Sequence, residues 1–411
     1  MDLETVKKLD TKDPLAKKRE EFFIPKDKIY LDGNSLGPLT LVAKHRAIEV
    51  VEKQWGHELI ASWNLHNWID MPINVGEKIA PLIGAKEGQT ICCDSVSINL
   101  FKLLACALGI NSERESILST RENFPTDLYI AEGLQRLLGD GRCHLDLVER
   151  HELEARLKTK PAVLLLTHTD FRTGELFEIE RLTKQAHANG TLVIWDLSHS
   201  VGVFPLELDK WEVDFAVGCS YKFLNGGPGS PAFLYVADQH IRNCENPISG
   251  WMGHKSPFTF EQKYKAHQGM AKFLSGTPPI LSMAMLDAAL ESFKDIDIKA
   301  LRIKSIQLTE LFLSILQENG ALDQLRLCSP SSANSRGSQL AFSHKNGFGI
   351  CQALAAKEVI ADFRSPNLLR FGFSPLHLRF EDIWQSCTAV KEVLEEGMYL
   401  LPDFNKHLKV T

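Results

Sequence analysis

The stretch DFAVGCSYKFLNGGPGS, residues 214–230, combines a strand signal with an unusual set of polar side chains. The apolar run 215–217 predicts a buried strand that ends at Gly218. A thiol, a hydroxyl, a phenol and an amine follow at consecutive positions, and a glycine-rich turn comes after them. A lysine that follows a strand, as Lys222 does here, is usually a solvated loop residue. Whether Lys222 has a chemical role therefore depends on which side chains follow the neighbouring strands at the same edge of the sheet.

The segments around this stretch alternate between strands and helices. A helical pattern that begins at residue 179 ends at Gly190, which suits a left-handed helix cap. Strands separated by helices predict α/β units around a largely parallel sheet. The apolar runs that are too short for helices predict strands at 89–94, 116–120, 163–167, 191–196, 214–218 and 231–236.

After residue 280 the pattern changes to long amphipathic helices, followed by short strands and a last amphipathic helix. The short strands are expected at 339–343, 358–362 and 368–372. This second pattern of helices and short strands predicts a smaller α+β unit beside the α/β unit. We expect three parts: an N-terminal arm over 1–45 that packs on the small domain, a large cofactor-binding domain over 46–280, and a small C-terminal domain over 281–411.

The composition is that of a soluble globular protein, with 411 residues, 44% hydrophobic and 24% charged. A net charge of −6 gives no electrostatic reason to expect a nucleic-acid or membrane partner. The polar N-terminus resembles no secretory signal, and no apolar run approaches the roughly 18 residues of a membrane span. We therefore expect a cytoplasmic protein whose nine cysteines are reduced. The histidine spacings match no zinc motif, so no metal site is predicted.

Three of the predicted strands end in polar side chains. Thr167 ends one strand, Asp196 ends the next with His199 shortly after it, and Lys222 follows the third. The carboxyl ends of parallel strands meet at one edge of the sheet, and ligands of open α/β sheets bind at that edge. We therefore expect an acid, a histidine and a lysine in one site.

Pyridoxal phosphate requires such a set of groups. A lysine amine forms a Schiff base with its aldehyde, and a carboxylate opposite the pyridine nitrogen keeps that nitrogen protonated. Its phosphate requires an anion site, and Ser95 and Ser97 open an apolar helix whose first N–H groups provide one. Each residue also has an ordinary alternative: Asp196 and Ser97 suit helix caps, and His199 suits a structural histidine. The combination, rather than any single residue, carries the prediction.

Beyond these residues, the chain resembles the bacterial kynureninases, which are fold-type-I pyridoxal-phosphate enzymes. The resemblance covers nearly the whole chain and rests on YLDGNSLGP at 30–38, NFPTDLY, DLSHSVG, CSYKFLNGGPG, GWMGH and SGTPPI, in the family's order. It implies the fold-type-I transferase fold, with a mostly parallel central sheet in the large domain and a smaller α+β C-terminal domain. It also implies pyridoxal 5'-phosphate as the cofactor and a homodimer with active sites at the subunit interface.

The implied reaction is the hydrolytic cleavage of the Cβ–Cγ bond of L-kynurenine to anthranilate and L-alanine. A second candidate substrate is 3-hydroxy-L-kynurenine, which would give 3-hydroxyanthranilate. The implied setting is the kynurenine pathway of tryptophan catabolism, which also leads to NAD biosynthesis.

The resemblance implies roles for individual residues. Lys222 is the Schiff-base lysine, Asp196 the partner of the pyridine nitrogen, and Tyr221 beside the lysine is our candidate proton relay. The implied cofactor site consists of Val96, Ser97, Phe124, Asp127, Thr167, Asp196, His199, Tyr221, Lys222 and, from a second subunit, Trp251 and Thr277. The implied substrate site consists of Arg370 for the α-carboxylate, Trp63 for the aromatic ring, Gly276 and Asn34.

Other classes of protein remain open at this point. One is another fold-type-I enzyme, either a cysteine desulfurase or an aminotransferase. Desulfurases need a mobile cysteine late in the chain, and neither Cys328 nor Cys351 has the supporting motif. Their cofactor ring stacks on a histidine, where this chain offers Phe124. A non-catalytic α/β binding protein is the remaining alternative, which the joint presence of acid, lysine and arginine disfavours.

Overall fold

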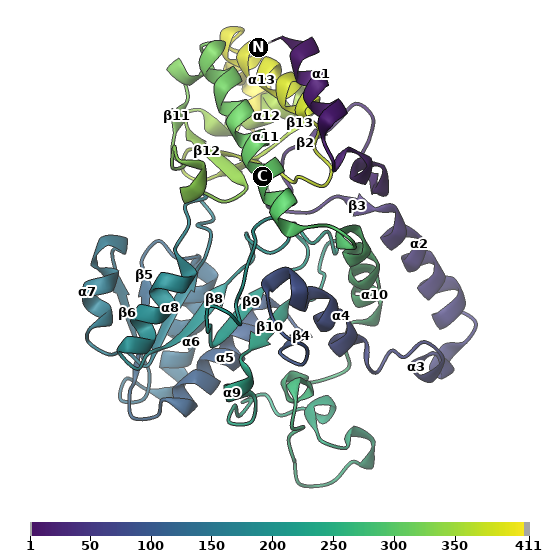
Figure 1. Cartoon of the computed structure of the whole chain (residues 1–411), viewed down its shortest axis with the longest axis vertical. Coiled ribbons are helices and arrows are strands. Elements are labelled where there is room, and N and C mark those ends of the chain that lie inside the picture. The colour runs from purple at the N-terminus through teal and green to yellow at the C-terminus, as the bar shows by residue number, and fades with distance from the viewer. Residues whose placement is uncertain (1, 407–411) are drawn as a thin grey trace.

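The computed structural model describes residues 2–406, which form a seven-stranded sheet, a four-stranded sheet and two short two-stranded ribbons. Figure 1 shows the seven-stranded sheet in the lower half of the molecule and the four-stranded sheet with its helices above it. The strand order of the large sheet is β4-β10-β9-β8-β7-β5-β6. Its strands are β4 (Thr90–Cys92), β5 (Ser116–Thr120), β6 (His144–Val148), β7 (Val163–Thr167), β8 (Leu192–Asp196), β9 (Phe215–Gly218) and β10 (Phe233–Val236).

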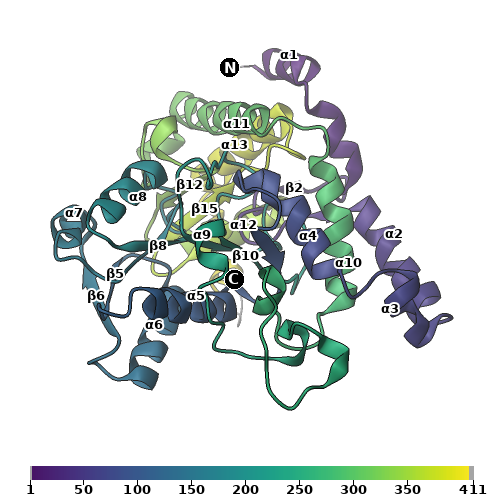
Figure 2. The ribbon, with the colours of Figure 1, turned by 60° about the horizontal axis from the view of Figure 1, so that its bottom comes forward.

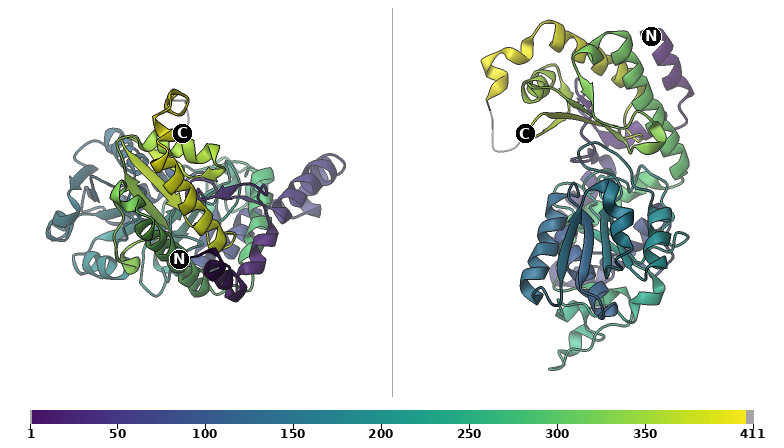
Figure 3. Two further views of the ribbon diagram at one scale, coloured as in Figure 1. Left: turned by 90° about the horizontal axis from the view of Figure 1, so that it is seen from above. Right: turned by 90° about the vertical axis from the view of Figure 1, so that its left-hand side faces the viewer.

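The large sheet is mostly parallel, as the sequence predicted. Strands β6, β5, β7, β8 and β9 pair in parallel, whereas β10 is antiparallel to both β9 and β4. Every residue of β7 and of β9 is buried, because helices cover both faces of the sheet. Burial on both faces explains why these strands are continuous apolar runs rather than alternating ones. Figure 3, right, shows the sheet enclosed between its two helical layers.

Two core clusters occupy the two faces of this sheet. Val163 and Leu165 of β7 pack on one face with helices α5 and α6, and Leu164 and Leu166 pack on the other with α4, α8 and α10. This alternation is the two-residue period of a strand. The helices of this unit are α4 (Met71–Ile79), α5 (Val96–Ile110), α6 (Pro125–Leu138), α7 (Leu153–Leu157), α8 (Ile179–Ala188), α9 (Asp238–Ile241) and α10 (Ile280–Ala289).

The structure differs from the sequence prediction at the edges of the sheet. Strand β6 was not predicted, because as an edge strand it is mostly half-exposed and carries no continuous apolar run. The predicted strand at 89–94 is confined to β4, since Asp94 adopts a left-handed backbone with φ of 47°. In the small unit the predicted strand at 358–362 is divided into β13 (Val359–Ile360) and β14 (Asp362–Arg364), which pair with different partners.

The small unit is an antiparallel sheet in the order β11-β12-β15-β14, covered by helices. Four phenylalanine rings, those of Phe312, Phe342, Phe371 and Phe373, contact one another in its core. Its elements are α11 (Ile298–Glu318), β11 (Arg326–Leu327), β12 (Gln339–Ser343), α12 (Gly347–Ala356), β14, β15 (Leu368–Gly372) and α13 (Phe380–Glu395).

The first forty residues contact both units, since α1 (Leu3–Lys12) and β2 (Ile29–Tyr30) lie along the small unit whereas Leu15 and Phe22 belong to the core of the large sheet. Helix α1 packs against α13, and β2 pairs in parallel with β13. The Asp13 carboxylate forms a buried ion pair with Lys304 of α11 at 2.7 Å. Strand β1 (Phe22–Phe23) precedes β2 and pairs with β3 (Leu39–Thr40), which follows it. The chain then continues through α2 (Leu41–Glu49) and α3 (Ser62–Leu65), and α2 packs against α10 (Figure 2).

The division into 1–45, 46–280 and 281–411 remains a proposal. Leu308 and Phe312 of α11 belong to the core of the small unit. Met283 and Leu286 of α10, in contrast, belong to the core of the large sheet. Among residues 2–406, no helix combines the length and the apolar character needed to cross a membrane.

Candidate active site

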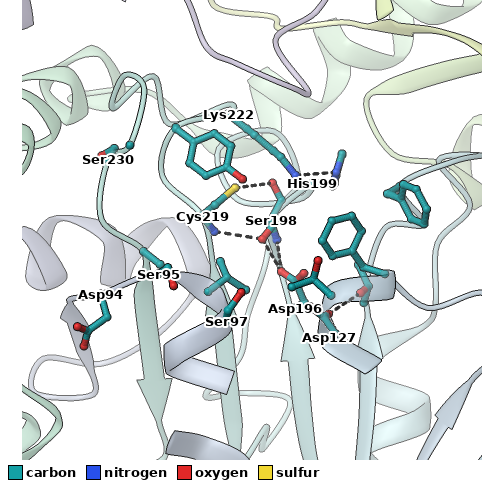
Figure 4. A pocket seen from close by; sticks show the side chains of 18 residues that line it. Asp94, Ser95, Ser97, Asp127, Asp196, Ser198, His199, Cys219, Lys222 and Ser230 are labelled. Atoms are coloured by element: carbon teal, nitrogen blue, oxygen red, sulfur yellow. Dashed lines mark hydrogen bonds between the residues drawn. The ribbon is translucent and has the colours of Figure 1, made fainter. Parts of the chain in front are cut away.

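A cavity of about 380 Å³ lies where β7, β8 and β9 end, at the carboxyl edge of the large sheet (Figure 4). It brings together each residue that was predicted to bind the cofactor from the same chain. Those residues are Val96, Ser97, Phe124, Asp127, Thr167, Asp196, His199, Tyr221 and Lys222. Asp94, Ser95, Thr126, Phe171, Ser198, Cys219, Gly229, Ser230 and Ala232 complete the lining.

Lys222 points across the cavity toward His199, with 2.8 Å between its Nζ and the histidine Nε2 (Figure 4). The turn that carries the lysine is packed closely against the N-terminal segment. A Cβ atom on Gly37 would lie 2.2 Å from the Lys222 carbonyl oxygen, and one on Gly226 would lie 2.4 Å from the Ser230 Oγ. These glycines therefore permit the close approach that holds the lysine in place.

Two carboxyl groups lie buried at the opposite end of the cavity. Asp196 accepts hydrogen bonds from the backbone N–H and the hydroxyl of Ser198, at 2.8 and 2.5 Å. The Thr167 hydroxyl lies 3.4 Å from Oδ2 of Asp127, whose Oδ1 has no hydrogen-bond partner. An orphaned carboxyl oxygen in a buried site marks a place for a donor or a cation.

The two carboxyl groups differ in their surroundings. Burial and the charge of Asp196 raise the pKa of Asp127 well above its ordinary value. Burial also raises the pKa of Asp196, but the Ser198 hydrogen bonds and the charge of Lys222 oppose this effect. Of the two, Asp127 is therefore the group that the surroundings favour in the protonated form, and Asp196 is the one that they favour in the charged form.

Helix α5 begins at the third side of the cavity. Ser95 is its N-cap and accepts from the Ile98 N–H at 3.4 Å. The preceding N–H groups, including those of Val96 and Ser97, have no partner within the helix, as in any first turn. Together with the Ser97 and Ser230 side chains, which line the same cavity, they form a site for an anion such as phosphate.

A buried lysine lies beside this helix start and was not predicted from the sequence. Lys102 is fully buried, pairs with Asp94 at 2.5 Å and donates to the Phe273 carbonyl oxygen at 2.5 Å. Its ammonium neutralises a carboxylate that would otherwise repel a phosphate at the helix start. The sequence signal was present, since a lysine inside the apolar helix VSINLFKLLACALGI must find a buried partner.

Replacing Lys102 with methionine is expected to lower the free energy of unfolding by about 1–2 kcal/mol, because the change leaves the partly exposed Asp94 without its counter-ion and the Phe273 carbonyl oxygen without its donor. It should also raise the dissociation constant of pyridoxal phosphate about tenfold, since the free carboxylate repels the phosphate. Urea titration and cofactor titration measure the two effects. The matched control is Lys158→Met on the surface, and equal values for both variants would contradict the role of Lys102.

The residues predicted to bind the substrate do not line this cavity. Arg370 is buried and donates to both oxygens of Asp362, with 2.8 Å from its Nε to Oδ1. Its Nη1 also donates to the carbonyl oxygen of Phe171, whose residue does line the cavity. Asn34 is buried with its Nδ2 3.5 Å from the Oε1 of Gln339. Arg370 thus lies directly behind the cavity wall, whereas Asn34 contacts a residue that does not line the cavity.

The remaining predicted residues lie farther away. The Trp63 ring packs edge-on against Trp68 in the region of α3, at the outer end of α2 (Figure 1). Trp251 is 37% exposed and stacks on the Phe260 ring. Gly276 and Thr277 are exposed. One chain does not bring these residues into the cavity, so their predicted roles remain proposals.

Ser198, Phe171 and Cys219 also line the cavity without having been predicted. Ser198 had a readable signal, since a hydroxyl two residues after an aspartate often bonds to it. The sequence contains no comparable signal that would place Phe171 or Cys219 in the site. Within residues 2–406, Cys219 is the one cysteine of this lining, whereas Cys328 and Cys351 belong to the small unit.

Comparisons with solved structures describe the fold. Cysteine desulfurase CsdA from Escherichia coli, in its S-sulfonic acid form, is 18% identical with a TM-score of 0.78, covering 93% of this chain and 98% of that one. A C-DES variant with glycine covalently linked to its pyridoxal-phosphate cofactor is 16% identical with a TM-score of 0.78, covering 91% and 99%. The architecture is that of fold-type-I pyridoxal-phosphate enzymes, which confirms the predicted fold class.

Comparisons of sequence are more specific. The family model for the kynureninase C-terminal domain matches residues 301–390. A kynureninase from Burkholderia pseudomallei (strain 1106a) is 43% identical over 408 residues, 98% of each chain. A kynureninase from Pseudomonas fluorescens is 41% identical over the same length and share. These relatives do not favour the desulfurase and aminotransferase alternatives. The chain belongs to the kynureninase family.

Proposed function

We propose that this chain is a pyridoxal-phosphate-dependent hydrolase that cleaves the Cβ–Cγ bond of L-kynurenine to anthranilate and L-alanine. The observation that carries the proposal is the 43% identity to a kynureninase over 98% of the chain. The cavity supports it, because it offers an amine, a buried carboxylate and an anion site in one space.

The residues of the cavity fit pyridoxal phosphate. Lys222 supplies the amine that binds its aldehyde, the buried pair of Asp127 and Asp196 suits a cationic ring nitrogen, and the start of α5 suits the phosphate. Phe124 and Thr167 line the space between these groups. When bound, the cofactor supplies an electron sink for the negative charge that develops on the substrate's α-carbon.

Lys222 and Asp196 have different roles in the first proton transfer: Lys222 moves the proton, and Asp196 supplies a fixed negative charge. Lys222 is the base that takes the α-proton on its Nζ once the substrate amine has replaced it. Asp196 keeps its negative charge and so stabilises a positive charge at the opposite end of the site. The raised pKa of Asp127 disfavours a second carboxylate charge beside Asp196.

Tyr221 is proposed to give a proton rather than to take one first. The neighbouring Cys219, burial and the charge of Asp196 raise the pKa of its phenol. A phenol acts as a base at neutral pH only when its pKa is lowered, so the surroundings favour the neutral form. Tyr221 would then donate to the γ-carbonyl oxygen as water adds and recover a proton from that water. As the Cβ–Cγ bond breaks, it would protonate the β-carbon and take the proton released by one hydroxyl of the hydrated carbonyl.

Arg370 is proposed to bind the α-carboxylate of the substrate. Asp362 accepts hydrogen bonds from Nε and Nη2 of the Arg370 guanidinium. Nη1 donates instead to the Phe171 carbonyl oxygen, so it is the atom that could bind a substrate. A substrate carboxylate would replace that carbonyl at Nη1. A charge-assisted bond is stronger than one to a neutral carbonyl, so the exchange is favourable.

A homodimer is proposed to complete the site. Trp251 and Thr277 would reach the phosphate of a second subunit, and Trp63 and Gly276 would contact the aromatic ring of the substrate. Exposed apolar side chains on and after α2, namely Val42, Ile48, Val51 and Trp55, support such an association. We also propose a cytoplasmic location.

The direct test is incubation of the cofactor-loaded protein with L-kynurenine, with anthranilate followed by fluorescence and L-alanine by amino-acid analysis. We expect equal amounts of both products and a kcat/KM of about 10⁴ M⁻¹s⁻¹ or more. 3-Hydroxy-L-kynurenine, assayed in parallel, gives the substrate preference. Sulfide release from L-cysteine with no anthranilate from either substrate would contradict the proposal and favour a desulfurase.

A further inference from the structure

Gln339, the first residue of β12, joins the small unit to the wall of the cavity. Its side chain is buried, with 1% of the residue exposed. Its Oε1 lies 3.1 Å from the Nδ1 of His199. Its Nε2 lies 3.2 Å from the carbonyl oxygens of both Asp170 and Phe171. No role in the reaction described above uses this residue.

These contacts determine which way the amide of Gln339 points. Carbonyl oxygens only accept hydrogen bonds, so the two carbonyls of Asp170 and Phe171 require the NH₂ group on their side. The amide oxygen is then on the side of His199, where the Asn34 NH₂ group, 3.5 Å away, also faces it. The opposite orientation would place donors against donors and acceptors against acceptors.

The amide orientation in turn determines the state of His199. An amide oxygen can only accept, so the facing Nδ1 must carry the hydrogen. The ring itself is neutral, because burial and the positive charges of Lys222, Arg370 and Arg364 lower the pKa of His199 well below its ordinary value. In a neutral imidazole with hydrogen on Nδ1, the Nε2 is an acceptor, and it lies 2.8 Å from the Lys222 Nζ.

We propose that Gln339 is a positioning residue that holds His199 as the Nδ1–H tautomer, so that Nε2 accepts a hydrogen bond from Lys222. This role rests on the proposed function, in which Lys222 must be orientated to bind the cofactor and then to take a proton. The tautomer, rather than the charge, is the property that Gln339 controls.

The NH₂ group of Gln339 shares a hydrogen-bond acceptor with Arg370, the residue proposed to bind the substrate carboxylate. The Phe171 carbonyl oxygen accepts from both Gln339 Nε2 and Arg370 Nη1. The Phe171 ring packs edge-on against Phe124, with 5.1 Å between the ring centroids. Gln339 therefore positions His199 on one side and keeps the Phe171 carbonyl in place when a substrate carboxylate takes over Nη1 of Arg370.

The tautomer can be read directly by NMR of the full chain labelled with ¹⁵N-histidine, before and after loading with pyridoxal phosphate. The His199→Gln variant identifies the His199 signals. We expect a protonated Nδ1 and an unprotonated Nε2 for His199 in both forms. A protonated Nε2 in either form would overturn the proposal, and this measurement requires no variant at Gln339.

The variant Gln339→Met removes the hydrogen bonds of the amide oxygen and those of the NH₂ group, with little change in side-chain volume. We expect mixed His199 tautomers in the NMR spectrum and a kcat for L-kynurenine about tenfold lower than wild type. Gln339→Glu keeps an acceptor for His199 but places an oxygen against the Asp170 and Phe171 carbonyls. We expect it to retain the Nδ1–H tautomer and to raise KM for L-kynurenine, since the Phe171 carbonyl is displaced.

The matched control is Gln324→Met, at an exposed position outside the cavity, which should match wild type in both measurements. An unchanged Nδ1–H tautomer in folded Gln339→Met would overturn the proposal. If wild type shows the Nδ1–H tautomer and the variant loses it, but neither cleaves kynurenine, the proposed function fails while the role of Gln339 toward His199 stands.

Discussion

Replacing Lys222 with alanine is expected to lower kcat for L-kynurenine by at least about 10⁴-fold, as loss of a covalent nucleophile does in other enzymes. The physical reason is that the cavity contains no second amine. Lys222 is the one lysine or arginine in its lining within residues 2–406, and Lys102 is held by Asp94 and the Phe273 carbonyl oxygen. Anthranilate fluorescence measures turnover.

A second measurement identifies the residue that binds the cofactor covalently. Borohydride reduction of the loaded protein should attach the cofactor to a peptide that contains Lys222 in wild type and to no peptide in Lys222→Ala. The control Lys158→Ala changes an exposed lysine and should behave as wild type. Turnover within tenfold of wild type in Lys222→Ala would show that another group performs the covalent step.

Replacing Asp196 with asparagine is expected to lower kcat by about 10²- to 10³-fold. Asparagine keeps the shape and the oxygen that accepts from Ser198, but it removes the negative charge that we propose balances the cofactor ring. The residue is only 3% exposed, so water cannot substitute for the missing charge. Stopped-flow absorbance should show that removal of the α-proton has become the slow step.

Asp127→Asn provides the matched comparison. Burial and the charge of Asp196 raise the pKa of Asp127 well above its ordinary value, which favours the neutral carboxyl group, so the substitution is expected to remove less negative charge than Asp196→Asn. We therefore expect a clearly smaller loss of kcat than in Asp196→Asn. Equal losses would show that the negative charge is shared by both groups rather than held by Asp196.

The central strands could be predicted because they are buried on both faces. Runs such as 163–167 and 215–217 contain no polar residue until the strand ends, and the structure places β7 and β9 there. Edge strand β6 has half-exposed residues and gave no comparable signal. The same local logic placed Thr167, Asp196 and Lys222 in one site, because parallel strands end at one edge of the sheet.

Other parts of the site depend on contacts between distant segments. His199 and Gln339 are 140 positions apart, and Lys102 and the Phe273 carbonyl are 171 apart. A lysine in an apolar helix indicates that Lys102 needs a buried partner, but no pattern in either segment identifies which residue that partner is. Trp251 and Thr277 illustrate a further limit, because their predicted partner is a second subunit rather than another part of the same chain.

The sequence by itself determined which chemical groups meet: the amine of Lys222, the carboxyl of Asp196 and the start of helix α5. These follow from residue type and local pattern, since a strand or helix ends within a few residues of its signal. Only the tertiary structure decided the surroundings that shift their protonation: the burial of Asp127 beside Asp196, the burial of Tyr221 beside Cys219, and the Gln339 amide oxygen 3.1 Å from the Nδ1 of His199. Protonation depends on burial and on neighbouring charges and donors, which folding brings from remote parts of the chain.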